Sequence, residues 1–198
     1  MEEDQRRKRI ETMGKINCSD DMLFEKTVAS RTVFEGKVFD VEIKDIVTPE
    51  GNTSIREIVK HPGGACILPI DGEGNCYLVK QFRSPFGKVM LEAPAGKLEP
   101  GEDPLHCVSR EITEETGFTA GRIECMGAIA ATPGYCSEII TLFIGTELEY
   151  KGGEPDPNEY IATVKMPLSD AIKMAENGEI IDAKTLVLLY KAQGRSGI

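Results

Sequence analysis

The sequence predicts an α+β fold, or a three-layer α/β/α arrangement around a mixed sheet, with a small antiparallel β-sheet appended at the N-terminal end. Two observations lead to this prediction. Strand-like runs come first, one helical segment interrupts them, further strand-like runs follow, and two helical segments close the chain. In addition, the extended segment at residues 24–60 is set apart from the rest by the turn-forming run His61-Pro62-Gly63-Gly64.

The N-terminal segment has the pattern of a small antiparallel sheet. Strand formers alternate there with charged residues, namely Val33, Val38, Phe39, Val41, Glu42, Ile43, Lys44, Ile46 and Val47. The run Pro49-Glu50-Gly51-Asn52 then leads into Ile55, Ile58 and Val59, which predicts a hairpin. About three strands are hardly stable alone. The sheet is therefore expected to pack on the main domain or on a second subunit.

The remaining elements follow in the order strands, helix, strands, helices. Further strands are predicted over residues 66–70, 77–81, 89–92, 123–129, 139–144 and 160–165. The turn at residues 71–75 is expected to pair 77–81 back onto 66–70. The closing helices are predicted over residues 169–177 and 182–193, stopped by Gly178 and Gly194. We expect a flexible tail at residues 1–22, the N-terminal sheet at 23–61 and the main domain at 62–198.

Composition and charge exclude several classes of function. The chain has 198 residues, a net charge of -10 and no Trp, which argues against a general nucleic-acid or membrane-surface binder. No run approaches the length of a membrane span, and the N-terminus lacks the apolar core of a secretory signal. The six cysteines form no C-x-x-C pair. We therefore expect no zinc site, reduced thiols and a cytoplasmic location.

One helix is predicted with clear limits, over residues 104–116. Asp103 is a good N-cap, Pro104 suits the first turn, and Gly117 suits the position after the helix. At about 100° per residue, a core stripe falls on Leu105, Val108 and Ile112.

The same geometry sorts the charged residues of this helix. Glu111 and Glu115 lie together on the edge of the core stripe, whereas Arg110 and Glu114 point to another side. Clustered carboxylates are electrostatically costly unless a cation neutralises them, and hard divalent cations prefer oxygen ligands. The preceding loop at residues 93–101 is rich in Gly and Pro and can add backbone carbonyls. From the helix alone, an ordinary acidic amphipathic helix remains an equal alternative.

The full spacing decides between these alternatives. The pattern G-x5-E-x7-R-E-U-x-E-E-x-G-U, with U apolar, is matched by Gly96, Glu102, Arg110, Glu111, Ile112, Glu114, Glu115, Gly117 and Phe118. It resembles the Nudix box. The resemblance implies the Nudix hydrolase fold, cleavage of a diphosphate linked to a nucleoside, and Mg²⁺ or Mn²⁺ held by the glutamates of the box. Arg110 would belong to the catalytic group by supporting a carboxylate through charge-assisted hydrogen bonds.

Other segments resemble the ADP-ribose pyrophosphatase branch of that family. They include the loop Thr132-Pro133-Gly134-Tyr135-Cys136-Ser137-Glu138, and residues 56–63, 79–83, 92–97 and 182–185. The resemblance covers about residues 24–192. It implies hydrolysis of ADP-ribose to AMP and ribose 5-phosphate.

Metal-binding and catalytic residues follow from the resemblance. Glu111, Glu115 and the Ala95 carbonyl would hold the metal, with Glu114 nearby or sharing. The general base in this branch comes from the later loop, which corresponds here to Glu138. Glu114 is the competing candidate for the base.

Substrate-binding residues are expected on the strands. Arg56 and Arg83 are candidate anchors, because guanidinium groups bind phosphates and stack on adenine. Glu57 is a further candidate for substrate binding, because its segment, residues 56–63, resembles the ADP-ribose pyrophosphatase branch. His61, in a turn, and His106, on the outer part of the helix, are expected to have structural roles.

The resemblance also gives the N-terminal sheet a role. In this branch the comparable sheet crosses to a second subunit and completes its substrate pocket, so we expect a homodimer. Two alternatives stay open. In the first, the substrate is another nucleoside diphosphate sugar or a dinucleotide. In the second, the protein is a non-catalytic nucleotide sensor. The presence of every carboxylate of the box argues against the sensor.

Overall fold

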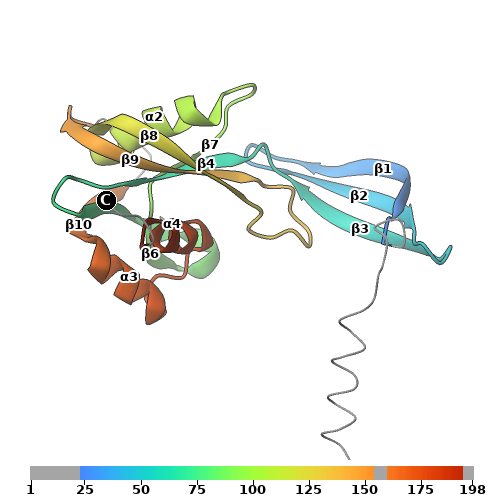
Figure 1. Ribbon diagram of the computed structural model, residues 1–198. Helices are drawn as coiled ribbons and strands as arrows, with labels where there is room; N and C mark the ends of the chain where they lie inside the picture. The colour runs from blue at the N-terminus through green and yellow to red at the C-terminus, as the bar shows by residue number, and fades with distance from the viewer. Residues whose placement is uncertain (1–22, 154–159, 194–198) are drawn as a thin grey trace, which may run out of the picture. The chain divides into compact units, whose positions relative to one another are not determined.

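The structure is a computed structural model that describes residues 23–153 and 160–193 (Figure 1). The chain divides into two compact units, one that ends at Val59 and one that begins at Lys60. The tail predicted at residues 1–22 and the helix stop predicted at Gly194 lie outside the described residues.

The N-terminal unit is a three-stranded sheet in the order β1-β2-β3, as predicted. Its strands are β1 (Lys26–Glu35), β2 (Asp40–Val47) and β3 (Thr53–Lys60), and β1 runs antiparallel to β2. In the β2–β3 turn, Gly51 has φ 87°, a conformation that favours glycine, and its N–H donates to the Thr48 carbonyl at 2.9 Å.

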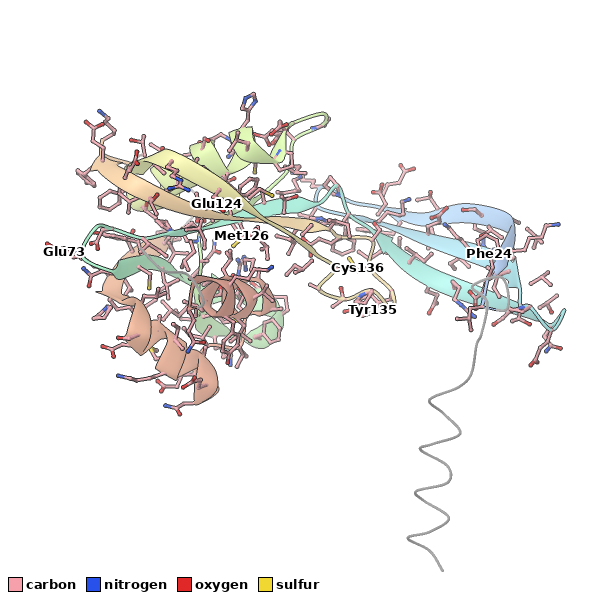
Figure 2. All side chains as sticks on the ribbon, in the orientation of Figure 1. Phe24, Glu73, Glu124, Met126, Tyr135 and Cys136 are labelled. Atoms are coloured by element: carbon pink, nitrogen blue, oxygen red, sulfur yellow. The ribbon has the colours of Figure 1, made fainter. Side chains whose placement is uncertain are left out.

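This sheet leaves an unusual amount of apolar surface in water. Every residue of β1 is exposed. Large apolar side chains exposed in this unit are Leu23, Phe24 (Figure 2), Val28, Val33, Phe34, Val38, Phe39 and Ile55. Among the described residues up to Val59, only Ile46 is a buried hydrophobic residue. The sheet therefore has almost no core of its own.

The second unit contains two sheets. The mixed four-stranded sheet has the order β7-β4-β9-β8, formed by β7 (Ala95–Lys97), β4 (Gly64–Pro69), β9 (Ile140–Tyr150) and β8 (Phe118–Ile129). Only the β4–β9 pair is parallel in it. The antiparallel three-stranded sheet has the order β10-β5-β6, formed by β10 (Ile161–Pro167), β5 (Asn75–Arg83) and β6 (Lys88–Glu92).

The predicted pairing of residues 77–81 with 66–70 is wrong. A single bridge joins Ile70 to Cys76 beyond the turn, and β4 and β5 then enter different sheets. The physical reason is that both edges of β4 are occupied, by β7 on one side and β9 on the other. Strand β5 pairs with β6 and β10 instead.

Helices cover both sides of the sheets (Figure 1). These are α2 (Pro104–Thr116), α3 (Leu168–Glu176) and α4 (Ala183–Gln193), while the short 3-10 helix η2 (Ser84–Phe86) joins β5 to β6. Successive residues of β4 face opposite ways. Ala65 and Ile67 pack with the buried residues of α2, and Cys66 and Leu68 pack with those of α3 and α4. The result is the predicted three-layer α/β/α arrangement.

Helix α2 has the limits predicted for it. Asp103 Oδ1 accepts a hydrogen bond from Leu105 N at 2.7 Å, and Gly117 has φ 75° with its N–H bonded to the Thr113 carbonyl. Val108 and Ile112 are fully buried, as expected, but Leu105 is 43% exposed. The prediction of Leu105 as a core residue is wrong, since the first turn extends past the edge of the core that begins at Cys107.

Across residues 23–153 and 160–193, none of the helices has the length and apolarity that crossing a bilayer requires.

Candidate active site

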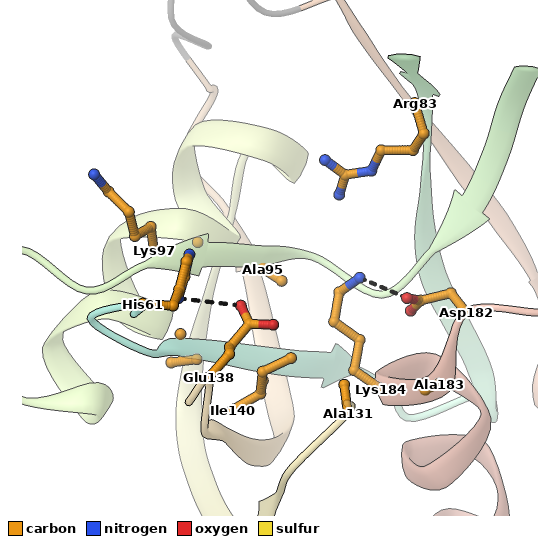
Figure 3. A pocket seen from close by; sticks show the side chains of 13 residues that line it. His61, Arg83, Ala95, Lys97, Ala131, Glu138, Ile140, Asp182, Ala183 and Lys184 are labelled. Atoms are coloured by element: carbon orange, nitrogen blue, oxygen red, sulfur yellow. Dashed lines mark hydrogen bonds and ion pairs between the residues drawn. The ribbon is translucent and has the colours of Figure 1, made fainter. Parts of the chain in front are cut away.

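The second unit contains a cavity of about 290 Å³ (Figure 3). Peptide segments of β4 and β7, the end of β5, the loop before β9 and the first turn of α4 surround it. The ionisable side chains that line the cavity are His61, Arg83, Lys97, Glu138, Asp182 and Lys184. Two of the predicted site residues, Arg83 and Glu138, therefore come together with the predicted carbonyl donor Ala95.

The carboxylate of Glu138 lies on one side of the cavity, against His61 (Figure 3). His61 Nδ1 is 3.4 Å from Glu138 Oε1, a contact that becomes an ion pair when the imidazole is protonated. The same Nδ1 accepts a hydrogen bond from Gly63 N at 3.1 Å, and His61 N donates to Ser137 Oγ at 3.0 Å. His61 thus anchors the loop that carries Glu138. His106 is exposed on α2.

The backbone of β7 lies against the two predicted metal-binding carboxylates. Ala95 N donates to Glu115 Oε2 at 3.1 Å. A Cβ built on Gly96 would overlap Glu111 Oε1 and lie 2.6 Å from Glu111 Cγ, so only glycine leaves room for that carboxylate. Both side chains therefore reach the Ala95–Gly96 segment, which itself lines the cavity.

Arg110 binds three carboxylates. Its Nη1 donates to Glu111 Oε1 at 2.7 Å and to Glu114 Oε2 at 3.0 Å, and its Nη2 lies 3.5 Å from Glu102 Oε1. The prediction that Arg110 points away from Glu111 is wrong. Its long side chain curls across the helix surface and reaches that carboxylate. Burial lowers the pKa of Arg110, but attraction and hydrogen bonds from Glu111 and Glu114 outweigh it and raise the pKa.

A buried ionic network forms the opposite side of the cavity. Glu92, 2% exposed, accepts hydrogen bonds from Arg83 Nε at 2.7 Å and Nη2 at 2.8 Å. Lys184 Nζ lies 2.5 Å from Glu92 Oε2 and 2.9 Å from Asp182 Oδ1. Burial raises the pKa of Glu92, but the Arg83 hydrogen bond and the Lys184 charge outweigh that effect and lower the pKa to about 2.

A family comparison matches most of the second unit. Residues 60–189 match the NUDIX domain. The chain belongs to the Nudix family. The family and the fold predicted from the box are thereby confirmed.

Relatives of this Nudix chain carry different names. The ADP-ribose pyrophosphatase of Bacillus subtilis (strain 168) is 42% identical over 173 residues, covering 86% of this chain and 94% of the relative. The methanol dehydrogenase activator of Bacillus methanolicus is 36% identical over 171 residues, covering 85% and 92%. The crystal structure of an ADP compounds hydrolase superposes with a TM-score of 0.75 at 21% identity, covering 88% of this chain and 98% of that one. At that identity the superposition shows the shared fold alone.

Nudix ADP-ribose pyrophosphatases are metal-dependent hydrolases, and the residues present here fit a hard divalent cation. The Glu111 carboxylate occupies the space beside Gly96 that a side chain there would fill, and the Glu115 carboxylate is held by the neighbouring Ala95 N. Within the described part of the chain, no three His, Cys, Asp or Glu side chains are grouped to hold an ion unaided. Backbone oxygen, water and substrate phosphate would complete the shell, as is usual for Mg²⁺.

Sequence reasoning missed the network behind Arg83. Glu92 carries a signal, because it is a carboxylate between the apolar residues Leu91 and Ala93. Lys184 carries another, since a cation in the first turn of α4 opposes the helix dipole. Neither residue type predicts which residue the other binds. That pairing depends on the tertiary packing that brings Lys184 of α4 to Glu92 at the end of β6.

The other predicted substrate residues lie in the N-terminal unit. Arg56 and Glu57 are on β3. Arg56 Nε donates to Glu25 Oε2 at 3.0 Å, and its Nη2 forms an ion pair with the same carboxylate. Their role toward the substrate remains a prediction.

The depressed pKa of Glu92 predicts a pH dependence of stability. Its folded pKa of about 2 lies below the ordinary 4.5, so the unfolded chain takes up this proton first as pH falls. The stabilisation is complete above pH 4.5 and is lost between there and pH 2, by roughly 3 kcal/mol. Urea unfolding across that window should show a flatter pH dependence for Glu92→Gln than for the unmodified chain. Equal slopes would contradict the assignment.

Proposed function

We propose that the protein hydrolyses the diphosphate of ADP-ribose to AMP and ribose 5-phosphate, using Mg²⁺, with Mn²⁺ as the alternative. The observation that carries the proposal is the cavity, where Glu138 and the Ala95–Gly96 segment face a side formed by Arg83 and Lys184. The ADP-ribose pyrophosphatase relative supports the substrate.

Glu111, Glu115 and the Ala95 carbonyl would hold the metal. When bound, the ion neutralises the diphosphate and makes a water molecule more acidic. Arg110 holds Glu111 and Glu114, which keeps the carboxylates of the box in place.

The protein's own groups supply the remaining steps. Glu138 accepts the proton of the attacking water at its carboxylate, with Glu114 as the competing base. Arg83 has two N–H groups engaged by Glu92 and directs the rest of its guanidinium to a phosphate. Arg56 and Glu57 are proposed to bind the nucleoside or the sugar.

A substrate panel tests the activity. With Mg²⁺ present, ADP-ribose should be the best substrate, with release of AMP, against other nucleoside diphosphate sugars and dinucleotides. If ADP-ribose is turned over no faster than these, the substrate assignment fails and a broader Nudix activity replaces it. Tight binding without turnover of any compound would favour a nucleotide sensor, a role compatible with the activator name of the second relative.

The N-terminal sheet is proposed to form a homodimer. Its exposed apolar surface, with only Ile46 among its described apolar residues buried, supports burial against a second copy. Sedimentation at micromolar concentration should give twice the 21.7 kDa chain mass. Phe34→Glu, on exposed β1, should shift the protein toward the monomer. A monomeric unmodified protein would refute the proposal.

A cytoplasmic location is also proposed. Among the described residues, Cys66, Cys76, Cys107, Cys125 and Cys136 are all free thiols. Reduced thiols are the usual state in that compartment. Cell fractionation provides the test.

A further inference from the structure

In the ionic network behind Arg83, each carboxylate oxygen and most of the N–H groups have a defined partner. Glu92 holds the guanidinium through both of its oxygens, which leaves Arg83 Nη1 without a partner among the contacts of the described residues. Asp182 Oδ2 accepts from Thr185 N at 3.1 Å and from the Thr185 hydroxyl at 2.5 Å, so it is anchored to α4. Lys184 Nζ pairs with Asp182 (Figure 3) and also with Glu92, so it bridges the two carboxylates.

The position of Lys184 is unfavourable for the helix by itself. The residue is 9% exposed, so its ammonium is largely removed from water. It also lies in the first turn of α4, where the helix dipole repels a cation. Attraction to Asp182 and Glu92 raises its pKa against the effect of burial, which keeps the ammonium charged.

By neutralising part of the charge of Glu92, Lys184 affects where the Arg83 guanidinium lies in the cavity. Without the ammonium, Glu92 would be a buried carboxylate whose only cation is Arg83, and it would draw that guanidinium into the protein. With Lys184 bound to Oε2, the negative charge of Glu92 is shared by two cations. The Arg83 guanidinium then stays held by two hydrogen bonds and keeps positive charge for an anion in the cavity.

We propose that Lys184 is a positioning residue for the diphosphate of the substrate, because it holds Glu92 in the geometry that directs Arg83 into the cavity. The inference rests on the proposed function. Lys184 acts through Arg83, and it is not required for the chemical step.

The test measures binding of α,β-methylene-ADP-ribose in the presence of Mg²⁺, since a carbon bridge cannot be hydrolysed. Lys184→Met should raise the Kd about tenfold, equal to about 1.4 kcal/mol. Lys184→Arg, which keeps the charge, should restore most of the affinity. The kcat of Lys184→Met at saturating ADP-ribose should stay within about threefold, with the loss seen in KM. Lys173→Met is the matched control, because Lys173 pairs with Asp170 at 3.0 Å on the exposed face of α3.

A double-mutant cycle with Arg83→Met separates positioning from direct contact. If Lys184 acts through Arg83, the double variant binds the analogue no more weakly than Arg83→Met alone. Losses that multiply would overturn the inference in favour of an independent phosphate contact. Unchanged affinity in a folded Lys184→Met would also overturn it, and melting curves with Lys184→Arg as reference check folding. If the unmodified protein does not bind the analogue, the proposed function fails, and the inference fails with it.

Discussion

Glu138→Gln is expected to lower kcat for ADP-ribose by about 10²–10⁴-fold, the usual size of a general-base contribution. Gln keeps the shape of the side chain and its hydrogen-bonding reach, but it cannot take up a proton at neutral pH. Glu138 lies in the cavity with one oxygen toward His61, so the change is confined to the site. Steady-state kinetics at saturating Mg²⁺ and substrate measure the effect, and affinity for the methylene analogue should be nearly unchanged.

Two further variants make this result specific. Glu114→Gln should cost less than about tenfold, because the Glu114 carboxylate is 42% exposed and engaged by Arg110 rather than placed in the cavity. Glu176→Gln, on the exposed end of α3, should leave turnover unchanged. Near-normal turnover of Glu138→Gln refutes the assignment, and a large loss in Glu114→Gln alone would make Glu114 the base.

Gly96→Ala is expected to lower kcat by about 10²-fold and to weaken metal binding. The new Cβ would overlap Glu111 Oε1, so the carboxylate must move by an amount on the order of 1 Å, a displacement of the size that can cost that much rate. The fold should survive, since a side chain rather than a strand gives way. Mn²⁺ titration of the protein without substrate measures the loss of metal affinity independently of activity.

The control for Gly96→Ala is a glycine with space around it. A Cβ on Gly72 would meet nothing within 4 Å, so Gly72→Ala should match the unmodified protein in metal affinity, turnover and thermal stability. Unchanged metal affinity and turnover in Gly96→Ala would mean that Glu111 does not need its position against β7. The carboxylate would then be removed from the metal-binding set.

Local signals account for the parts of the fold that were predicted well. Helix α2 begins and ends where predicted because Asp103 and Gly117 act on the backbone beside them. Strand pairing was predicted less well. The turn after β4 is a real turn, but β5 continues into another sheet because the edges of β4 are already taken by strands distant in the sequence.

The features of the candidate site also fall into those set by local sequence and those set by tertiary packing. The sequence by itself determined the family and the acidic face of α2, because a fixed spacing on one helix places side chains within reach of one another. The loop with Glu138 was suggested by the resemblance alone. Only the tertiary structure decided that His61 lies against Glu138 and that Lys184 meets Glu92 across 92 positions. Contacts of the last kind depend on how strand and helix pack, and no local pattern specifies the partner of a buried charge.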